Sequence, residues 1–154
     1  MRAYFFCLFL LVSASCQSLK KTHHVDSRIQ QAVATARSYT GTPYRYGGTT
    51  KRGMDCSGLL CVSYRSAGFE LPRTSTEQGK MGKAVKLTEL KPGDLVFFSK
   101  KKGRRKITHV GMVTEVQSGD QVMFIHSSSS RGVIENNLHS KYYRSIFVKA
   151  RRPF

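Results

Sequence analysis

The sequence predicts a single α+β domain, with helices packed on a small antiparallel sheet. Two observations carry this prediction. Up to about residue 79, apolar residues recur at helical spacing, and capping patterns precede two of the segments. After Gly82, apolar residues alternate or form short runs bounded by turns, as in strands. With 154 residues, the chain has the length of one domain with a substantial core, and it contains no internal repeat.

Three helices are predicted in the first half of the chain. The first starts at the capping-box pattern of residues 27–30, and the second runs from Cys56 to the stop signal at Gly68. A third, short helix is predicted at Ser75 to Gln78, which again fit a capping box. The polar residues between the N-terminus and the first helix have no periodicity and are predicted to form a tether.

Four strands are predicted in the second half. Residues 95–98 form an apolar run behind a Pro-Gly turn, and residues 142–150 are rich in aromatic and branched side chains. Between them, residues 107–116 and 121–127 alternate around the turn Ser118-Gly119-Asp120. We therefore expect the two middle strands to form an antiparallel hairpin.

The charge and the N-terminus together indicate the compartment. The formal net charge is +17 and the pI is about 10.2, which favours nucleic acid, anionic lipid or an acidic polymer as a partner. Residues 1–15 combine a positive start, an apolar run that is too short to span a bilayer, and a small-residue stretch. This pattern predicts an export signal, so nucleic acid is not expected as a partner.

Cys16 follows the small residues directly, and the arrangement resembles a bacterial lipoprotein signal in which this cysteine carries the lipid. The resemblance implies that residues 16–26 are the lipidated cysteine and tether of a domain spanning residues 27–154. The alternative is ordinary cleavage near Ser15 or Cys16, which would release a soluble secreted protein. The adjacent His23 and His24 are interpreted as solvated tether residues rather than metal ligands.

Two cysteines remain in the predicted domain. Cys56 lies at a helix start, where free N–H groups and the helix dipole favour the nucleophilic thiolate. Cys61 lies in the middle of the same helix and is predicted to be a buried, small apolar residue. Five residues apart on one helix, the two side chains diverge and are not expected to form a disulfide. The alternative for Cys56 is a buried structural thiol.

His109 begins one strand of the predicted hairpin and His126 ends the other, so antiparallel pairing places the two histidines side by side. A cysteine at a helix start and two converging histidines supply a nucleophile, a base and a group that orients the base. Zinc is the rival use of these residue types. No closely spaced pair of ligands anchors a zinc site, so no metal and no cofactor are predicted.

Six motifs, in this order, resemble those of the NlpC/P60 family of cell-wall cysteine peptidases. The resemblance covers roughly residues 27–154, and the motifs are Pro43-Tyr44-Arg45-Tyr46-Gly47-Gly48, Asp55-Cys56-Ser57-Gly58, Arg73-Thr74-Ser75, Pro92-Gly93-Asp94-Leu95-Val96-Phe97-Phe98, His109-Val110-Gly111-Met112 and Ile125-His126-Ser127. It implies a reduced papain-like fold. It also implies that Cys56 is the nucleophile, His109 the base and then the acid, and His126 the residue that orients His109.

The resemblance implies further roles. Tyr44 corresponds to a tyrosine whose hydroxyl lies near the scissile carbonyl, where it would help the Cys56 N–H to hold the oxyanion. The positions that line the pocket for the stem peptide are Asp55, Ser57, Arg73 and Ser75. The expected reaction is hydrolysis of an amide in peptidoglycan stem peptides, by resemblance the bond between γ-D-glutamate and the diamino acid.

Two other functions stay open at this stage: a non-catalytic, wall-binding lipoprotein, and an acyltransferase that uses the same thiol. The expected location is the bacterial envelope outside the cytoplasm, with a monomer anchored by lipid in the outer membrane and facing the periplasm. The basic segment of residues 99–106 is either a solvated loop or a contact for anionic wall polymer or lipid head groups.

Overall fold

The computed structural model describes residues 16–101, 103, 105–117 and 121–154. The predicted export signal and the predicted turn Ser118-Gly119-Asp120 lie outside these residues. The described helices, with one 3₁₀ turn η1, are α1 (Cys16–Arg37), α2 (Cys56–Ser66), α3 (Ser75–Gln78), η1 (Leu87–Glu89) and α4 (Lys141–Ile146). Within the described part of the chain, no helix combines the length and apolar character needed to cross a membrane.

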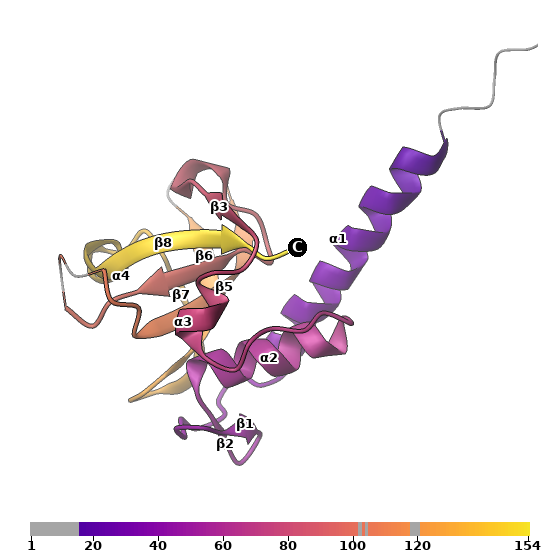
Figure 1. The fold of residues 1–154 in the computed structure, drawn as a ribbon. Helices are drawn as coiled ribbons and strands as arrows, with labels where there is room; N and C mark the ends of the chain where they lie inside the picture. The colour runs from indigo at the N-terminus through magenta and orange to yellow at the C-terminus, as the bar shows by residue number, and fades with distance from the viewer. Residues whose placement is uncertain (1–15, 102, 104, 118–120) are drawn as a thin grey trace, which may run out of the picture.

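Helix α1 starts earlier than predicted. It begins at Cys16 rather than at residue 27, so the predicted tether is helical. No glycine or proline occurs between Cys16 and Arg37, and Lys, Gln and Leu are good helix formers, so nothing in this segment interrupts the helix. In Figure 1, the N-terminal turns of α1 project away from the rest of the molecule.

One six-stranded antiparallel sheet forms the centre of the domain (Figure 1). Its strands are β3 (Lys83–Val85), β4 (Leu95–Phe98), β5 (His109–Val116), β6 (Val122–Ser128), β7 (Gly132–Asn137) and β8 (Phe147–Arg152). They are arranged in the order β3-β8-β4-β5-β6-β7. A separate small hairpin joins β1 (Thr49–Thr50) to β2 (Gly53–Met54) just before α2.

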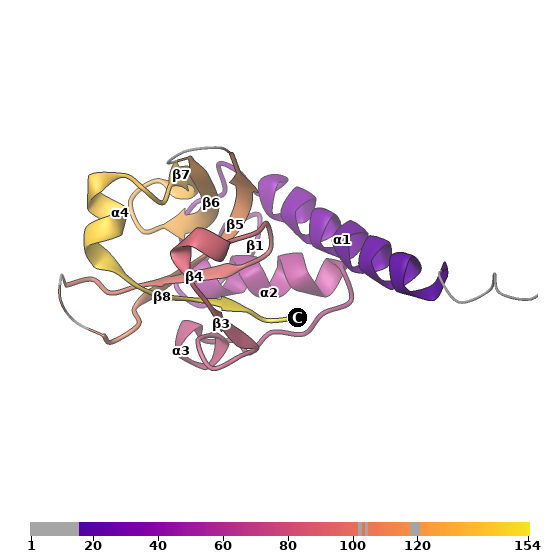
Figure 2. The ribbon, with the colours of Figure 1, turned by 90° about the horizontal axis from the view of Figure 1, so that it is seen from above.

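The two faces of the sheet bury different cores, as the alternation of side chains along a strand requires. Along β4, Leu95 and Phe97 pack with α1 and α2, whereas Val96 and Phe98 pack with α4. Figure 2 shows α4 at the opposite end of the molecule from α1. The predicted class, helices packed on an antiparallel sheet, is therefore confirmed.

Several element predictions need correction. Residues 142–150 were expected to form a strand, but they contain α4 followed by the first part of β8. Tyr143 of this helix is buried against the sheet, so its aromatic character serves packing rather than strand pairing. Strand β7 was not predicted. The cap of α3 is Thr74, one residue before the predicted Ser75.

Candidate active site

The loop before α2 is built around Asp55, which caps the helix that Cys56 begins. The Asp55 carboxylate accepts hydrogen bonds from the N–H groups of Gly58 and Gly47, each at 2.7 Å. Gly58 has to be a glycine, because a Cβ atom there would lie 2.3 Å from the carbonyl oxygen of Gly48. This close approach packs the loop onto the first turn of α2 and fixes the position of Cys56.

A charged cluster surrounds the same carboxylate. Arg73 donates two hydrogen bonds to Asp55, at 2.9 and 2.7 Å, and a third to the Ser57 hydroxyl at 2.9 Å. Burial raises the pKa of Asp55, but the hydrogen bonds from Arg73 and the two glycine N–H groups outweigh it, so the pKa lies below its usual value. Three of the four predicted pocket residues are thus in contact. Ser75 begins α3 and lies outside this hydrogen-bonded cluster.

The Cys56 thiol is buried, with 8% of the residue exposed. Burial raises its pKa, the backbone N–H of Val110 lowers it, and the nearby charge of Asp55 raises it again. The net pKa lies above the ordinary value. The expectation of a thiolate favoured by the helix start is therefore wrong in its net direction, because burial and the Asp55 charge outweigh the N–H groups.

The predicted contact between the two histidines is confirmed. His109 Nε2 and His126 Nδ1 are 2.8 Å apart, and the two rings are nearly perpendicular. The pairing of β5 with β6 runs from Met112–Ile125 to Val116–Val122, so the two histidines lie just beyond one end of the paired segment. The Val110 N–H acts on the Cys56 thiol, so the start of α2 lies against the same end of β5 that His109 begins.

Both histidines are neutral at physiological pH. Burial, followed by the neighbouring His126, lowers the pKa of His109 to about 3. Burial also lowers the pKa of His126, although a hydrogen bond with Asn136 acts in the opposite direction. A neutral imidazole beside an un-ionised thiol is the form that can accept the thiol proton.

Two residues near the histidines were missed by the sequence prediction. Asn136 of β7 lies with its Oδ1 atom 3.0 Å from His126 Nε2, and the Tyr143 hydroxyl of α4 is 3.1 Å from the same nitrogen. The residues diagonally opposite a histidine on the next strand are natural contacts. This signal could be used only if residues 132–137 had been recognised as a strand, and they were not.

The remaining predicted residues are placed as follows. Tyr44 lies in the loop before β1, and burial raises the pKa of its hydroxyl, as do the nearby Cys56 and Asp55.

Cys61 is buried, and its thiol donates towards the carbonyl of Pro72 at 3.3 Å, as expected for a structural thiol. Neither Cys56 nor Cys61 forms a disulfide, as predicted.

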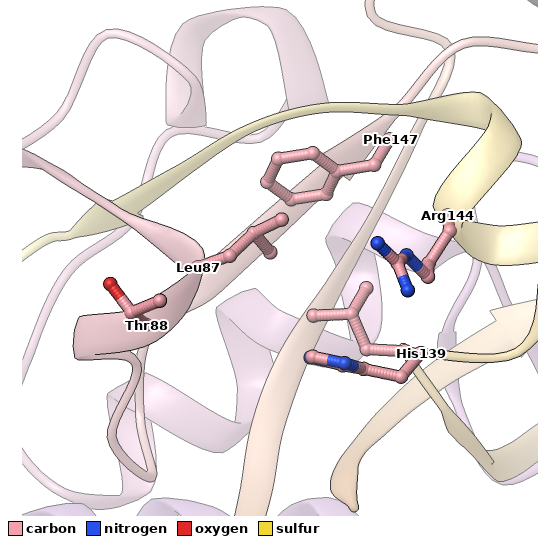
Figure 3. Close-up of a pocket in the computed structure, with 6 residues that line it drawn as sticks. Leu87, Thr88, His139, Arg144 and Phe147 are labelled. Atoms are coloured by element: carbon pink, nitrogen blue, oxygen red, sulfur yellow. The ribbon is translucent and has the colours of Figure 1, made fainter. Parts of the chain in front are cut away.

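A separate hollow of about 360 Å³ lies between η1 and α4 (Figure 3). Its lining residues are Leu87, Thr88, Leu138, His139, Arg144 and Phe147. None of the predicted site residues lines it. Within the described ranges, no group of three or more histidine, cysteine or acidic side chains is placed to hold a metal ion.

A thiol at a helix start, against the end of a strand that bears a neutral histidine pair, is the arrangement expected of a cysteine peptidase with a papain-like α+β fold. The chain is a peptidase of this class. It belongs to the NlpC/P60 family, whose model, described as "NlpC/P60 family", matches residues 41–152.

Named relatives and a solved structure agree with this assignment. The chain is 37% identical over 158 residues to "Probable endopeptidase NlpC" of Escherichia coli K12, covering 96% of this chain and 98% of the relative. It is 38% identical to "Murein DD-endopeptidase MepS/Murein LD-carboxypeptidase" of the same organism, covering 88% of this chain and 67% of the relative.

A third relative is the "Gamma-DL-glutamyl hydrolase" of Bacillus subtilis, at 38% identity over 82% of this chain and 30% of the relative. The crystal structure of a NlpC/P60 family protein from Bacillus cereus superimposes with a TM-score of 0.72 at 34% identity. It covers 81% of this chain and 40% of that one.

Proposed function

We propose that this peptidase hydrolyses an amide bond in peptidoglycan stem peptides. The observation that carries the proposal is the 2.8 Å contact between His109 and His126 at the strand end against which Cys56 lies. The names of the relatives support the substrate class, because one is a murein peptidase and another a γ-glutamyl hydrolase.

Each part of the site then has a role. Cys56 is the nucleophile, His109 is the general base and then the general acid, and His126 orients His109. The Cys56 N–H and the Tyr44 hydroxyl hold the oxyanion. The raised pKa of Cys56 and the lowered pKa of His109 support a resting state in which both groups are uncharged.

The reaction proceeds through a thioester. His109 takes the thiol proton as Cys56 Sγ attacks the carbonyl carbon of the scissile amide, and the electron pair of the C=O bond moves to oxygen. The oxyanion collapses, the C–N bond breaks, and the leaving amine takes the proton from His109. Water then attacks the thioester, gives a proton to His109, and releases the acid while Cys56 regains its proton.

The bond that we propose first is the one between γ-D-glutamate and the diamino acid. The B. subtilis γ-DL-glutamyl hydrolase supports this choice. The murein DD-endopeptidase and LD-carboxypeptidase of E. coli favours a second candidate, cleavage at D-alanine in a cross-linked or tetrapeptide stem. In both cases, the exposed part of Arg73 would bind a substrate carboxylate, and Asp55 with Ser57 would hold Arg73 in place.

The protein would act in the cell envelope, outside the cytoplasm. A lipid on Cys16 would anchor it in the outer membrane facing the periplasm, and the net charge of +17 would keep it near an anionic wall. The substrate partner is peptidoglycan, and the protein would work as a monomer.

Mass spectrometry of the products tests the proposal. The purified protein and its Cys56→Ala variant are incubated with a stem tripeptide, a stem tetrapeptide and a cross-linked muropeptide dimer. Release of an L-Ala-γ-D-Glu dipeptide by the wild type alone would support the first bond. Loss of D-alanine from the tetrapeptide, or conversion of dimer to monomers, would support the second.

Other outcomes would contradict the proposal. Binding of all three substrates without cleavage, by protein with a native circular dichroism spectrum, would favour a wall-binding function. Transfer of the acyl group to an added amine, with no free acid formed, would identify an acyltransferase.

A further inference from the structure

We propose that Asn136 is a positioning residue that, with Tyr143, fixes which nitrogen of His126 carries its proton, and through it which nitrogen of His109 does. The inference rests on the proposed function, because it assigns the arrangement of protons that a general base at His109 requires. It extends the Cys56, His109 and His126 set to a fourth and a fifth residue, on β7 and α4.

The chain of contacts is continuous. Starting from the base, His109 Nε2 is 2.8 Å from His126 Nδ1, and His126 Nε2 is 3.0 Å from Asn136 Oδ1. The Tyr143 hydroxyl donates to the same Oδ1 atom at 2.9 Å and lies 3.1 Å from His126 Nε2. All of these distances lie within the normal range for hydrogen bonds.

The amide oxygen at the end of the chain sets the direction of every bond. Asn136 Oδ1 carries no proton, so His126 Nε2 must donate to it. A neutral His126 then has a bare Nδ1 atom, which can only accept, so His109 must donate from Nε2. This leaves Nδ1 of His109 without a proton, and that nitrogen is free to take the proton of the Cys56 thiol.

The surroundings keep this chain uncharged. His126 is 2% exposed, and its ring stacks on Phe124 with the ring centres 5.0 Å apart. Among the described residues, the titratable and charged groups that face it are His109 from β5, Tyr143 from α4 and Arg131 from the turn before β7. None of the three is an acid that would favour a charged imidazole, and Arg131 opposes one.

Kinetics of two matched variants provide the first test. Asn136→Leu removes the acceptor at nearly constant size and is expected to lower kcat roughly 10- to 100-fold. KM should change by less than about twofold, because the Asn136 side chain contacts His126 and Tyr143 rather than the proposed pocket residues. Asn137→Leu, the same change at the next residue of β7, is the control and should leave kcat and KM near those of the wild type.

The pH profile separates positioning from mere structural support. Asn136→Asp keeps the acceptor but adds a negative charge, which raises the pKa of His126 and favours its doubly protonated form at low pH. That form cannot accept from His109, so the acid limb of the kcat/KM profile should shift to higher pH, with activity recovering above the shift. Equal loss of activity at every pH would overturn the inference.

Nitrogen NMR of ¹⁵N-histidine-labelled protein reads the protons directly and needs no substrate. We expect protons on Nε2 of both His109 and His126, assigned with His109→Gln and His126→Gln, and a mixture of tautomers in Asn136→Leu. A proton on His126 Nδ1 in the wild type would overturn the inference. Because this measurement is independent of cleavage, a failure of the proposed function leaves it interpretable on its own.

Discussion

The two halves of the proposed active site, one around the proposed nucleophile Cys56 and one around the proposed base His109, are held in place by opposite means. On the side of the nucleophile, Asp55 and Arg73 form a bidentate ion pair, and Arg73 keeps 42% of its side chain exposed. On the side of the base, His109, His126 and Asn136 are joined by hydrogen bonds between uncharged groups. The first half is charged and partly solvated, whereas the second is neutral and is centred on the buried His126.

The difference follows from what each half has to do. The loop before α2 needs only to be held still, and strong hydrogen bonds to a fixed carboxylate do this well. In the proposed mechanism, the base has to gain and lose a proton. A permanent charge beside it would bias that exchange, whereas a chain of neutral donors and acceptors fixes the geometry and leaves His109 able to titrate during the reaction.

Removal of the central member of the neutral half should have the largest effect. We expect His126→Ala to lower kcat roughly 10³-fold, because His109 would lose the acceptor that fixes its tautomer. Steady-state hydrolysis of stem peptide by the folded variant measures this. A loss of less than about tenfold would mean that His109 does not depend on its partner.

The two halves should respond to acid in different pH windows. The pKa of His109 falls from 6.5 to about 3 on folding, so the unfolded chain takes up a proton below pH 6.5 that the native protein does not. The free energy of unfolding should therefore decrease as the pH is lowered, by about 2 kcal/mol from pH 7.5 to pH 5 for this group. His126 acts in the same direction. Urea unfolding at both pH values measures the change.

Asp55 acts in a lower window. Its pKa is depressed, so its contribution is present above its ordinary value of 3.8 and is lost as the pH falls through the native value. Because His109 contributes in the upper window and Asp55 in the lower one, His109→Gln should reduce the stability change between pH 7.5 and 5. The loss of stability below about pH 4 should persist in this variant. An unchanged slope in this variant would assign the acid sensitivity to other groups.

A milder change tests the charged half. Arg73→Lys keeps the charge but loses the fork that bonds both Asp55 oxygens, and the expected loss of stability is about 1 kcal/mol because Arg73 is partly solvated. Arg65→Lys is the control, since Arg65 forms an exposed ion pair with Glu70. Urea unfolding of both variants at pH 7.5 gives the comparison. Equal stability would show that the fork is dispensable.

The smallest effect is expected at the second thiol. Cys61→Ser should keep hydrolysis within about twofold of the wild type, because the Cys61 thiol contacts the Pro72 carbonyl and the Gln78 side chain and has no role in the proposed mechanism. Cys56→Ser is its counterpart and should be inactive. If both variants lost activity alike, the assignment of a single nucleophile would be wrong.

The parts of the site that the sequence predicted are those with local signals. The apolar spacing and the stop signal at Gly68 placed Cys56 at the start of α2, and the alternation of residues 107–116 and 121–127 placed the two histidines side by side. A local pattern, however, carries no information about burial at the site. For this reason, the pKa of Cys56 was predicted in the wrong direction.

The missed elements owe their structure to tertiary contacts. Residues 132–137 contain glycine, glutamate and two asparagines, which are poor strand formers, and they form β7 because β6 offers an edge to pair with. Tyr143 lies in a segment with strand-like composition, yet it is helical because its ring packs against Phe98 and Phe124. Asn136 and Tyr143 came from these two elements, so the sequence could not reveal their contact with His126.

The C-terminal end of α2 is joined to α1 and to the C-terminal residue by a second set of contacts. Arg28 of α1 donates to the carbonyls of Ala67 and Gly68 and lies 3.8 Å from the centre of the Phe69 ring, on which Phe154 stacks at 4.1 Å. The 11 residues of α2 separate this junction from Cys56 by about 16 Å. A label, bead or surface attached to α1 or to Phe154 would therefore hold the domain at the end remote from Cys56 and leave the Cys56 end accessible.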